Sequence, residues 1–329
     1  MFWFRRLALA GALLAASVVV LGAWVRLTDA GLGCPDWPGC YGHLYPDGGA
    51  KALHEMIHRY FATTLGLLIV VLFLWAVRAR RDLGQSLLPA ALLFGVVCVQ
   101  GTLGALTVTM LLKPLIVTAH LLGGLTTLGL LSWLSQRPPP PQPTDREAYL
   151  KRFAWAGLAA LIAQLALGGW TSANYAALAC PDLPTCQHSW WPQMDYRDAF
   201  VLWRGVGIDF EGGVLANPAR MAIHFTHRLG ALLAGSMLLT LGVLAAATRG
   251  NPRVSGAGLL LMFAVVLQIS IGAATVHWGV PLTLATLHNA GAAFLVISMV
   301  TLLRTLWPAA GRPAAETAVV PLHRAQPSR

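Results

Sequence analysis

The sequence contains few charged residues. Only 11% of its 329 residues are Asp, Glu, Lys or Arg, whereas soluble globular chains carry about 25%. Hydrophobic residues make up 56% of the chain, and the mean hydropathy is +0.63. Because so few charges cannot cover an ordinary soluble surface, we exclude soluble enzymes, secreted disulfide scaffolds and disordered chains. The composition indicates an integral membrane protein.

Acidic residues are the scarcer of the two charge types. The chain has 13 Asp and Glu against 23 Lys and Arg, which gives a net charge of +10. Such an excess also occurs in nucleic-acid-binding proteins. In a membrane protein the placement of basic residues matters more than their sum, so we expect no nucleic-acid partner and a lipid bilayer as the surroundings.

The apolar stretches do not show the alternation of a β-barrel, so the predicted spans are helices. Runs of about 20 apolar residues are long enough to cross a bilayer. Eight such runs occur, at about 7–25, 53–77, 87–109, 115–134, 153–171, 221–247, 256–275 and 282–306. The predicted fold is an all-α integral membrane protein with eight transmembrane helices.

The basic residues gather on one side of these spans. Fifteen of the 23 precede the first span or follow an even-numbered one: Arg5, Arg6, Arg78, Arg80, Arg81, Arg137, Arg146, Lys151, Arg152, Arg249, Arg253, Arg304, Arg312, Arg324 and Arg329. Basic residues are retained on the cytoplasmic side. We therefore expect a multi-pass protein of the cell (inner) membrane with both termini in the cytoplasm. The first span is too long for a signal peptide and should be retained.

The chain divides into two halves joined by a Pro-rich segment. We predict an N-terminal four-helix half over 1–136, a cytoplasmic linker over 137–152, a C-terminal four-helix half over 153–306 and a cytoplasmic tail over 307–329. The linker contains RPPPPQP, which is typical of a stiff, extended connection.

The two halves repeat one another. Cys34 and Cys40 recur as Cys180 and Cys186 at an offset of 146, in CPDWPGC and CPDLPTC. In the later spans, residues of the first half recur at an offset of 168 or 169. These matches indicate an internal duplication that gives two four-helix bundles. A glycine also recurs near the outer end of each odd-numbered span, at Gly22, Gly104, Gly168 and Gly272.

Each even-numbered span carries a histidine near its start: His58, His120, His227 and His288. All four lie five or six residues inside their spans, roughly 8 Å below the outer interface. Two imidazoles facing each other across a four-helix bundle suit axial ligation of haem iron. The sequence therefore predicts one haem-sized site in each half. Zinc or copper is the alternative, with His54, Glu55 and His224 as extra ligands.

The halves differ beside these histidines. Glu55 in EMIH occupies the position of His224 in HFTH, and residues three apart share a helix face. We therefore expect Glu55 to face the first pocket beside His58, as an acid, a base or a proton-relay group. An ion pair with Lys51 or Arg59 is the simpler interpretation. His54 and His224 are candidate pocket-lining residues. The candidate partners for haem propionates are Arg26, Arg59 and Arg228.

Both cysteine pairs fall in outer loops, where the compartment is oxidising. Their short spacing and turn-forming neighbours favour one disulfide within each loop, Cys34–Cys40 and Cys180–Cys186. A four-thiolate zinc site fits the spacing poorly. The disulfides are either structural or redox-active.

The combination of eight spans in two halves, EMIHRY, the histidine pairs and the CPDWPGC and CPDLPTC loops resembles the haem A synthases, in particular the bacterial type that contains the cysteine pairs. The resemblance implies an enzyme that oxidises the C8 methyl of haem O to a formyl group through hydroxylated intermediates. It also implies a haem b cofactor held by His227 and His288, substrate haem between His58 and His120, and Glu55 as the catalytic carboxylate. A haem O synthase would deliver the substrate. The electron donor stays unidentified, and a homo-oligomer is an open alternative.

Two other functions use similar features. A di-haem b-type electron-transfer subunit needs the same four histidines, although it gains nothing from Glu55 in one half only. A haem transporter can also be built from repeated halves. The haems that the protein retains distinguish these functions.

Overall fold

The structure is a computed structural model that describes residues 2–46, 49–79, 87–137 and 145–307. Within these ranges the regular secondary structure is helical, with two isolated β-bridges. The helices are α1 (Phe2–Leu27), α2 (Gly49–Arg78), α3 (Leu88–Thr109), α4 (Pro114–Ser135), α5 (Asp145–Ala173), α6 (Tyr196–Ala199), α7 (Asn217–Ala246), α8 (Pro252–His277) and α9 (Leu282–Leu306). All except α6 are long and apolar enough to cross a membrane, so the eight predicted spans are confirmed.

Most helices extend a few residues beyond the predicted spans. The largest difference is α5, which begins at Asp145 rather than 153 because its charged first turns continue the helix past the apolar run. Part of the predicted linker is therefore helical, while residues 138–144 and most of the predicted tail (308–329) lie outside the described residues. The short helix α6 was not predicted; Asp195 caps it by accepting hydrogen bonds from Arg197 N and Asp198 N.

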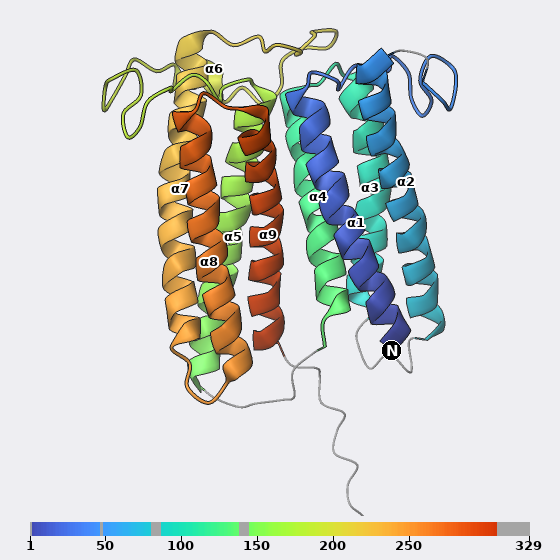
Figure 1. The fold of residues 1–329 in the computed structure, drawn as a ribbon, viewed down its shortest axis with the longest axis vertical. Helices are drawn as coiled ribbons and strands as arrows, with labels where there is room; N and C mark the ends of the chain where they lie inside the picture. The colour runs from blue at the N-terminus through green and yellow to red at the C-terminus, as the bar shows by residue number, and fades with distance from the viewer. Residues whose placement is uncertain (1, 47–48, 80–86, 138–144, 308–329) are drawn as a thin grey trace, which may run out of the picture.

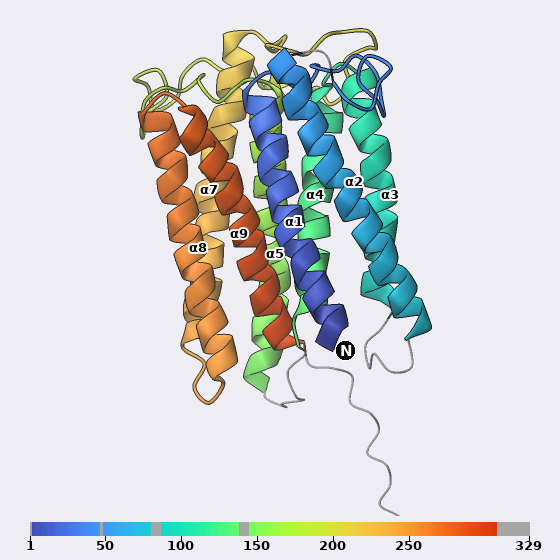
Figure 2. The ribbon, with the colours of Figure 1, turned by 45° about the vertical axis from the view of Figure 1, so that its right-hand side comes forward.

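The long helices form two four-helix bundles (Figures 1 and 2). In the first, α1 packs against α2 and α4, and α3 packs against the same two helices. In the second, α5 and α8 each pack against α7 and α9. The two bundles meet along α1, α4, α5 and α9. The predicted architecture of two four-helix bundles is thus confirmed.

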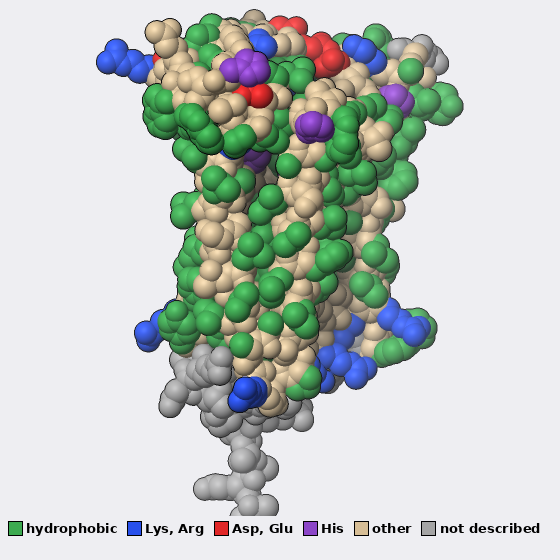
Figure 3. Space-filling view, turned by 60° about the vertical axis from the view of Figure 1, so that its left-hand side comes forward, with side chains coloured by type: hydrophobic (Ala, Val, Ile, Leu, Met, Phe, Trp, Pro, Cys, Tyr) green, Lys and Arg blue, Asp and Glu red, His purple; other side chains and the backbone are tan. Residues whose placement is uncertain are grey.

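The two ends of the molecule differ in character. One end, here called the disulfide end, holds both cysteine loops and the connection between α5 and α7 (Figure 1). The opposite end, the linker end, holds the N-terminus, the end of α4 and the start of α5. Figure 3 shows hydrophobic side chains over the middle of one face, Lys and Arg at both ends, and His and acidic residues toward the disulfide end. This distribution is that of a membrane-spanning surface.

The main apolar core lies toward the linker end. It includes Leu72 on α2, Leu131 on α4, Leu241 on α7 and Met299 on α9, all fully buried. On each of these four helices, the core begins at least five residues beyond the histidine: at Leu65, Leu125, Leu238 and Ala293. The four histidines, here called the histidine layer, therefore lie on the disulfide-end side of the main apolar core.

Candidate functional site

The four histidines lie on diagonally opposite helices of their bundles. His58 is on α2 and His120 on α4, and these two helices do not pack against each other over their described lengths. The same holds for His227 on α7 and His288 on α9. The paired histidines are therefore positioned across the centre of each bundle.

Each imidazole contacts a glycine on the preceding helix. A Cβ added to Gly272 would lie 2.8 Å from Cε1 of His288, and one added to Gly22 would lie 2.9 Å from Cε1 of His58. The corresponding distances are 3.2 Å for Gly168 and His227 and 3.5 Å for Gly104 and His120. The repeated glycines of α1, α3, α5 and α8 thus provide the surfaces against which the rings pack.

Two glutamines contact the histidines of the second bundle. Gln164 Nε2 lies 3.0 Å from Nδ1 of His227 and donates to the His227 carbonyl at 3.1 Å. Gln268 Nε2 likewise donates to the His288 carbonyl at 3.1 Å. Gln268 repeats Gln100 at the offset of 168, whereas sequence reasoning missed Gln164, whose signal is its position four residues before Gly168.

Gln100 is the equivalent residue in the first bundle, and its buried Nε2 has no hydrogen-bond partner. On α1 the position four residues before Gly22 is Val18. His58 is therefore the one histidine of the four whose repeat position carries no amide.

These features fit a haem in each bundle. Nδ1 of His58, His120 and His288 is buried without a hydrogen-bond partner, and the glycine contacts leave each ring beside a backbone that carries no side chain. A pair of imidazoles is a suitable axial ligand set for haem iron. Among the residues that the structure describes, no three His, Cys, Asp or Glu side chains gather as a metal site, so the zinc or copper alternative gains no support.

Both cysteine pairs form disulfides within their own loops, as predicted. The Cα atoms are 4.8 Å apart in the first loop (Cys34–Cys40) and 4.6 Å apart in the second loop (Cys180–Cys186). Both distances are typical of disulfides.

An aspartate organises each loop from within. Asp36 accepts hydrogen bonds from the backbone N–H groups of Gly42 at 2.8 Å and Tyr41 at 2.7 Å. These bonds, with the nearby Arg59 charge, hold the pKa of Asp36 below its ordinary value. Asp182 has the same place in the second loop, where the Thr185 hydroxyl and backbone N–H groups lower its pKa.

Glu55 is buried beneath the first loop. Its Oε2 accepts a hydrogen bond from the backbone N–H of Cys34 at 2.8 Å, and its Oε1 pairs with Nη2 of Arg59 at 2.5 Å. Both oxygens therefore have partners, one in the first loop and one on the next turn of α2. Charge-assisted hydrogen bonds of this kind are the strong ones available to a buried carboxylate. Of the two simpler ion pairs, the one with Arg59 is present; Lys51 lies 3.8 Å from Glu211 instead.

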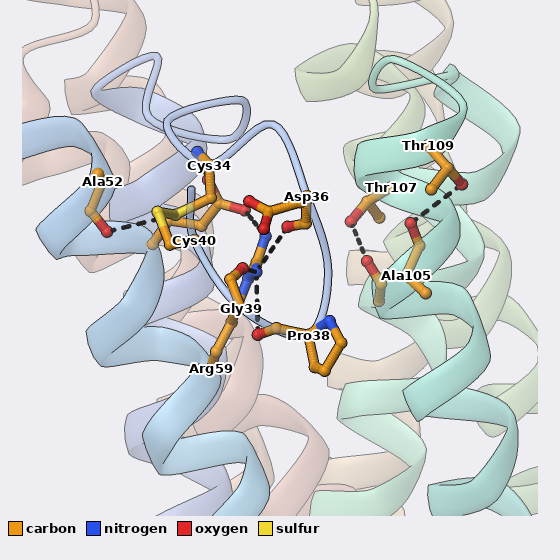
Figure 4. Close-up of polar contacts among 12 residues, drawn as sticks. Cys34, Asp36, Pro38, Gly39, Cys40, Ala52, Arg59, Ala105, Thr107 and Thr109 are labelled. Atoms are coloured by element: carbon orange, nitrogen blue, oxygen red, sulfur yellow. Dashed lines mark hydrogen bonds and ion pairs between the residues drawn. A yellow bond between two sulfur atoms is a disulfide. The ribbon is translucent and has the colours of Figure 1, made fainter. Parts of the chain in front are cut away.

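Arg59 connects Glu55 to the first loop. Its Nη1 donates to the carbonyl oxygens of Asp36 at 2.9 Å, Pro38 at 3.3 Å and Gly39 at 2.5 Å (Figure 4). Arg59 and Glu55 together therefore hold the first loop over the start of α2.

The second bundle repeats this arrangement with a histidine. His224 is buried, with Nδ1 3.4 Å from the Cys180 N–H and Nε2 3.3 Å from Nε of Arg228. Arg228 also donates to the carbonyls of Cys180, Asp182 and Thr185. A neutral imidazole has one acceptor nitrogen, so it cannot satisfy both donors, whereas a carboxylate can. The Glu55 contacts are accordingly the shorter ones.

The other predicted site residues have protein partners too. Arg26 donates to the Ser172 carbonyl at 2.8 Å and lies over the Tyr175 ring at 3.8 Å, so it connects the two bundles. A propionate would have to share Arg26, Arg59 or Arg228 with these partners. His54 is half-buried and packs edge-on against Trp24.

Part of the long connection before α7 covers the first bundle. Lys113, between α3 and α4, is 2% exposed. Its Nζ donates to the carbonyls of Arg204 and Gly205 and lies 3.8 Å from the Trp203 ring centroid. The Phe210 N–H also donates to the Leu111 carbonyl at 3.1 Å. This part of the connection, here called the covering segment (203–210), thus lies over the disulfide ends of α3 and α4, which sequence reasoning did not anticipate.

Comparison with known proteins extends across both bundles. The cytochrome oxidase assembly protein family (COX15-CtaA) matches residues 5–51 and 48–300. The chain belongs to this family. The chain is 42% identical to the heme A synthase of Shewanella oneidensis over 93% of this chain and 96% of that protein. It is 28% identical to the heme A synthase of Halalkalibacterium halodurans over 73% and 75%, and 26% identical to that of Granulibacter bethesdensis over 93% and 87%.

The match to the cytochrome oxidase assembly family includes every feature of the site. Its residue ranges contain both disulfide loops, the four histidines and their glycine contacts. The resemblance inferred from the sequence is thereby confirmed for the chain as a whole.

Proposed function

We propose that the protein is a haem A synthase, which oxidises the C8 methyl of haem O to a formyl group through hydroxylated intermediates. The observation that carries this proposal is the 42% identity to a heme A synthase over nearly the whole of both chains. The two histidine pairs, one in each bundle, support it, because the reaction needs one site for a substrate haem and one for a redox cofactor.

The second half (153–306) is proposed to hold haem b, which supplies electron transfer when bound. His227 and His288 would provide the axial nitrogens. Gln164 and Gln268 contact the backbone carbonyls of these two histidines and would hold them in place. Hydrogen bonds to a histidine from residues that do not bind the metal fix the orientation of the histidine as a ligand.

The first half (1–136) is proposed to bind the substrate haem between His58 and His120. Glu55 would act at the disulfide-end rim of this site, one helical turn from His58, and hold or move a proton there. Arg59 fixes the position of its carboxylate. The residues 137–152 and 307–329 would serve as the cytoplasmic linker and tail.

The proposal also includes the orientation of the protein in the membrane and the sources of its substrate and electrons. The termini would face the cytoplasm and the disulfide loops the outer side of the cell membrane. A haem O synthase would supply the substrate, and a separate donor would supply electrons. Protease added from the cytoplasmic side should cut the Pro-rich linker; cleavage only from the outer side would invert this topology.

The test is to identify haems in cells that make haem O but lack their own haem A synthase. Expression of this chain should yield haem A, and the purified protein should contain haem b. Glu55→Gln keeps the side-chain shape and removes the charge, so haem b should remain while haem A formation stops. His227→Ala and His288→Ala should each abolish the low-spin b-type spectrum. Wild-type protein that contains only haem b and forms no haem A would instead support an electron-transfer subunit.

A further inference from the structure

A lipid-facing groove runs between α3 and α4 in the first bundle. Its volume is about 560 Å³, within the range of about 300–1,000 Å³ for small-molecule sites. The groove extends along α3 from Leu88 to Leu103, about 22 Å of helix. Gly95, Ala119 and Thr126 contribute small side chains to its walls, and nearly all other lining residues are apolar. Its shape and lining suit a long hydrocarbon chain.

The groove reaches the histidine layer. Ala119 lines it and directly precedes His120, and Gly123 lines it one turn further along α4. Gln100, also in the lining, lies one turn from Gly104, which contacts the His120 ring. The groove therefore comes within one helical turn of His120 on α4 and ends beside Gln100, whose side chain lies against Gly123.

The second bundle fills the corresponding positions. At the offset of 168, Gly95 corresponds to Phe263, Thr126 to Phe294 and Ala119 to Leu287. The Phe263 and Phe294 rings meet edge to face with centroids 6.3 Å apart. The half proposed to hold haem b, which has no long side chain, thus carries bulky residues where the other half carries small ones.

Haem O, the substrate of the proposed function, carries a farnesyl tail, which is a long isoprenoid hydrocarbon chain. We propose that the α3–α4 groove binds this tail, an inference that rests on the proposed function. The groove holds the tail by close van der Waals packing and so also fixes the rotation of the macrocycle and thereby the ring methyl that is presented for oxidation. The groove would also distinguish the substrate from tail-less haem b.

The decisive variant fills the groove as the second bundle does. Gly95→Phe with Thr126→Phe should lower the farnesylated haem that co-purifies with the protein at least about tenfold, the change produced by about 1.4 kcal/mol of lost binding. Haem b should stay at its wild-type level. A Cβ at Gly95 meets no atom within 4 Å, so the backbone accepts the larger residue. Binding of added tail-less haem b to the substrate half should be unaffected.

Gly101→Phe is the matched control. Gly101 is an exposed glycine on the same helix, its Cβ would also meet no atom within 4 Å, and it lies outside the groove lining. It should retain farnesylated haem. If the double variant loses haem b as well, its fold is disturbed, and the smaller change Ala119→Leu is used instead. Ala119→Leu copies Leu287 of the second bundle, and the measurement is again the amount of farnesylated haem and haem b that co-purifies.

Unchanged farnesylated haem in the groove-filled protein would overturn the inference, as would an equal loss of tailed and tail-less haem. Wild-type protein serves to separate the two proposals. If it makes haem A and the filled variant does too, the groove inference alone fails. If wild type neither makes haem A nor binds farnesylated haem, the proposed function fails.

Discussion

Replacing the glycines that contact the histidine rings by alanine tests the histidine layer, because the distance between the new methyl group and the ring differs from one glycine to the next. In Gly272→Ala the new Cβ would lie 2.8 Å from His288 Cε1, and in Gly22→Ala 2.9 Å from His58 Cε1. In Gly104→Ala it would lie 3.5 Å from His120 Cε1, an ordinary contact. All three substitutions gain the same helix propensity, about 0.8–1.0 kcal/mol. Differences among them therefore report the ring contacts.

The size of the effect follows from overpacking. Extra methyl groups in a well-packed site cost about 1–3 kcal/mol, because here the imidazole has to move away from the position that it needs as a ligand. If this cost falls on haem binding, affinity decreases about 5- to 150-fold. Gly168→Ala, at 3.2 Å from His227, should give a smaller loss. Gly104→Ala should leave haem binding unchanged and make the fold slightly more stable.

The assay is the haem b content per protein and its low-spin absorption after purification. Gly272→Ala should lose most haem b, Gly168→Ala less, and Gly22→Ala should keep haem b while it loses substrate haem. The reasoning would be refuted if Gly104→Ala lost as much substrate haem as Gly22→Ala, or if Gly272→Ala kept a full complement of haem b with a normal spectrum.

Three further predictions concern the disulfide end. Because Asp36 has a lowered pKa, its contribution to loop stability is complete above the ordinary carboxyl value of 3.8 and is lost as the pH falls below it; the protection of the first-loop amides, which is the exchange rate relative to the intrinsic rate at the same pH, should decrease there, whereas Asp36→Asn should give low protection at every pH. Lys113→Met keeps the stem but removes the donor to two carbonyls, worth about 1.5–3 kcal/mol for charged hydrogen bonds; protease should then cut within 201–213 faster, and unchanged cleavage would contradict the covering role. His224→Glu should satisfy both the Cys180 N–H and Arg228, and slower amide exchange in the second loop would show it.

The sequence predicted the fold well because membrane spans are determined by apolar length, which is a local property. It also located the histidines, since a repeated residue at constant depth is visible in the chain. It offered Arg59 as a partner of the Glu55 carboxylate, which lies on the next turn of the same helix, but it missed the Cys34 N–H, because helix periodicity does not show which group reaches a side chain from a loop. The covering segment is held over Lys113 by hydrogen bonds between residues that are about 91 positions apart in the sequence, and no local pattern predicts such a contact.

The differences between the halves argue against two permanent haem carriers. The histidines, their glycines and the arginine-bound loops are the same in both bundles, as expected of features that hold a haem. The differences are Glu55 in place of His224, the open groove in place of the Phe263–Phe294 contact, and the covering segment at Lys113. The three differences involve different residues, yet all three concern the first bundle. A carrier whose two haems only exchange electrons has no use for an acid, a hydrocarbon groove and a covering segment at one haem alone. The proposed enzyme would use all three at its proposed substrate site.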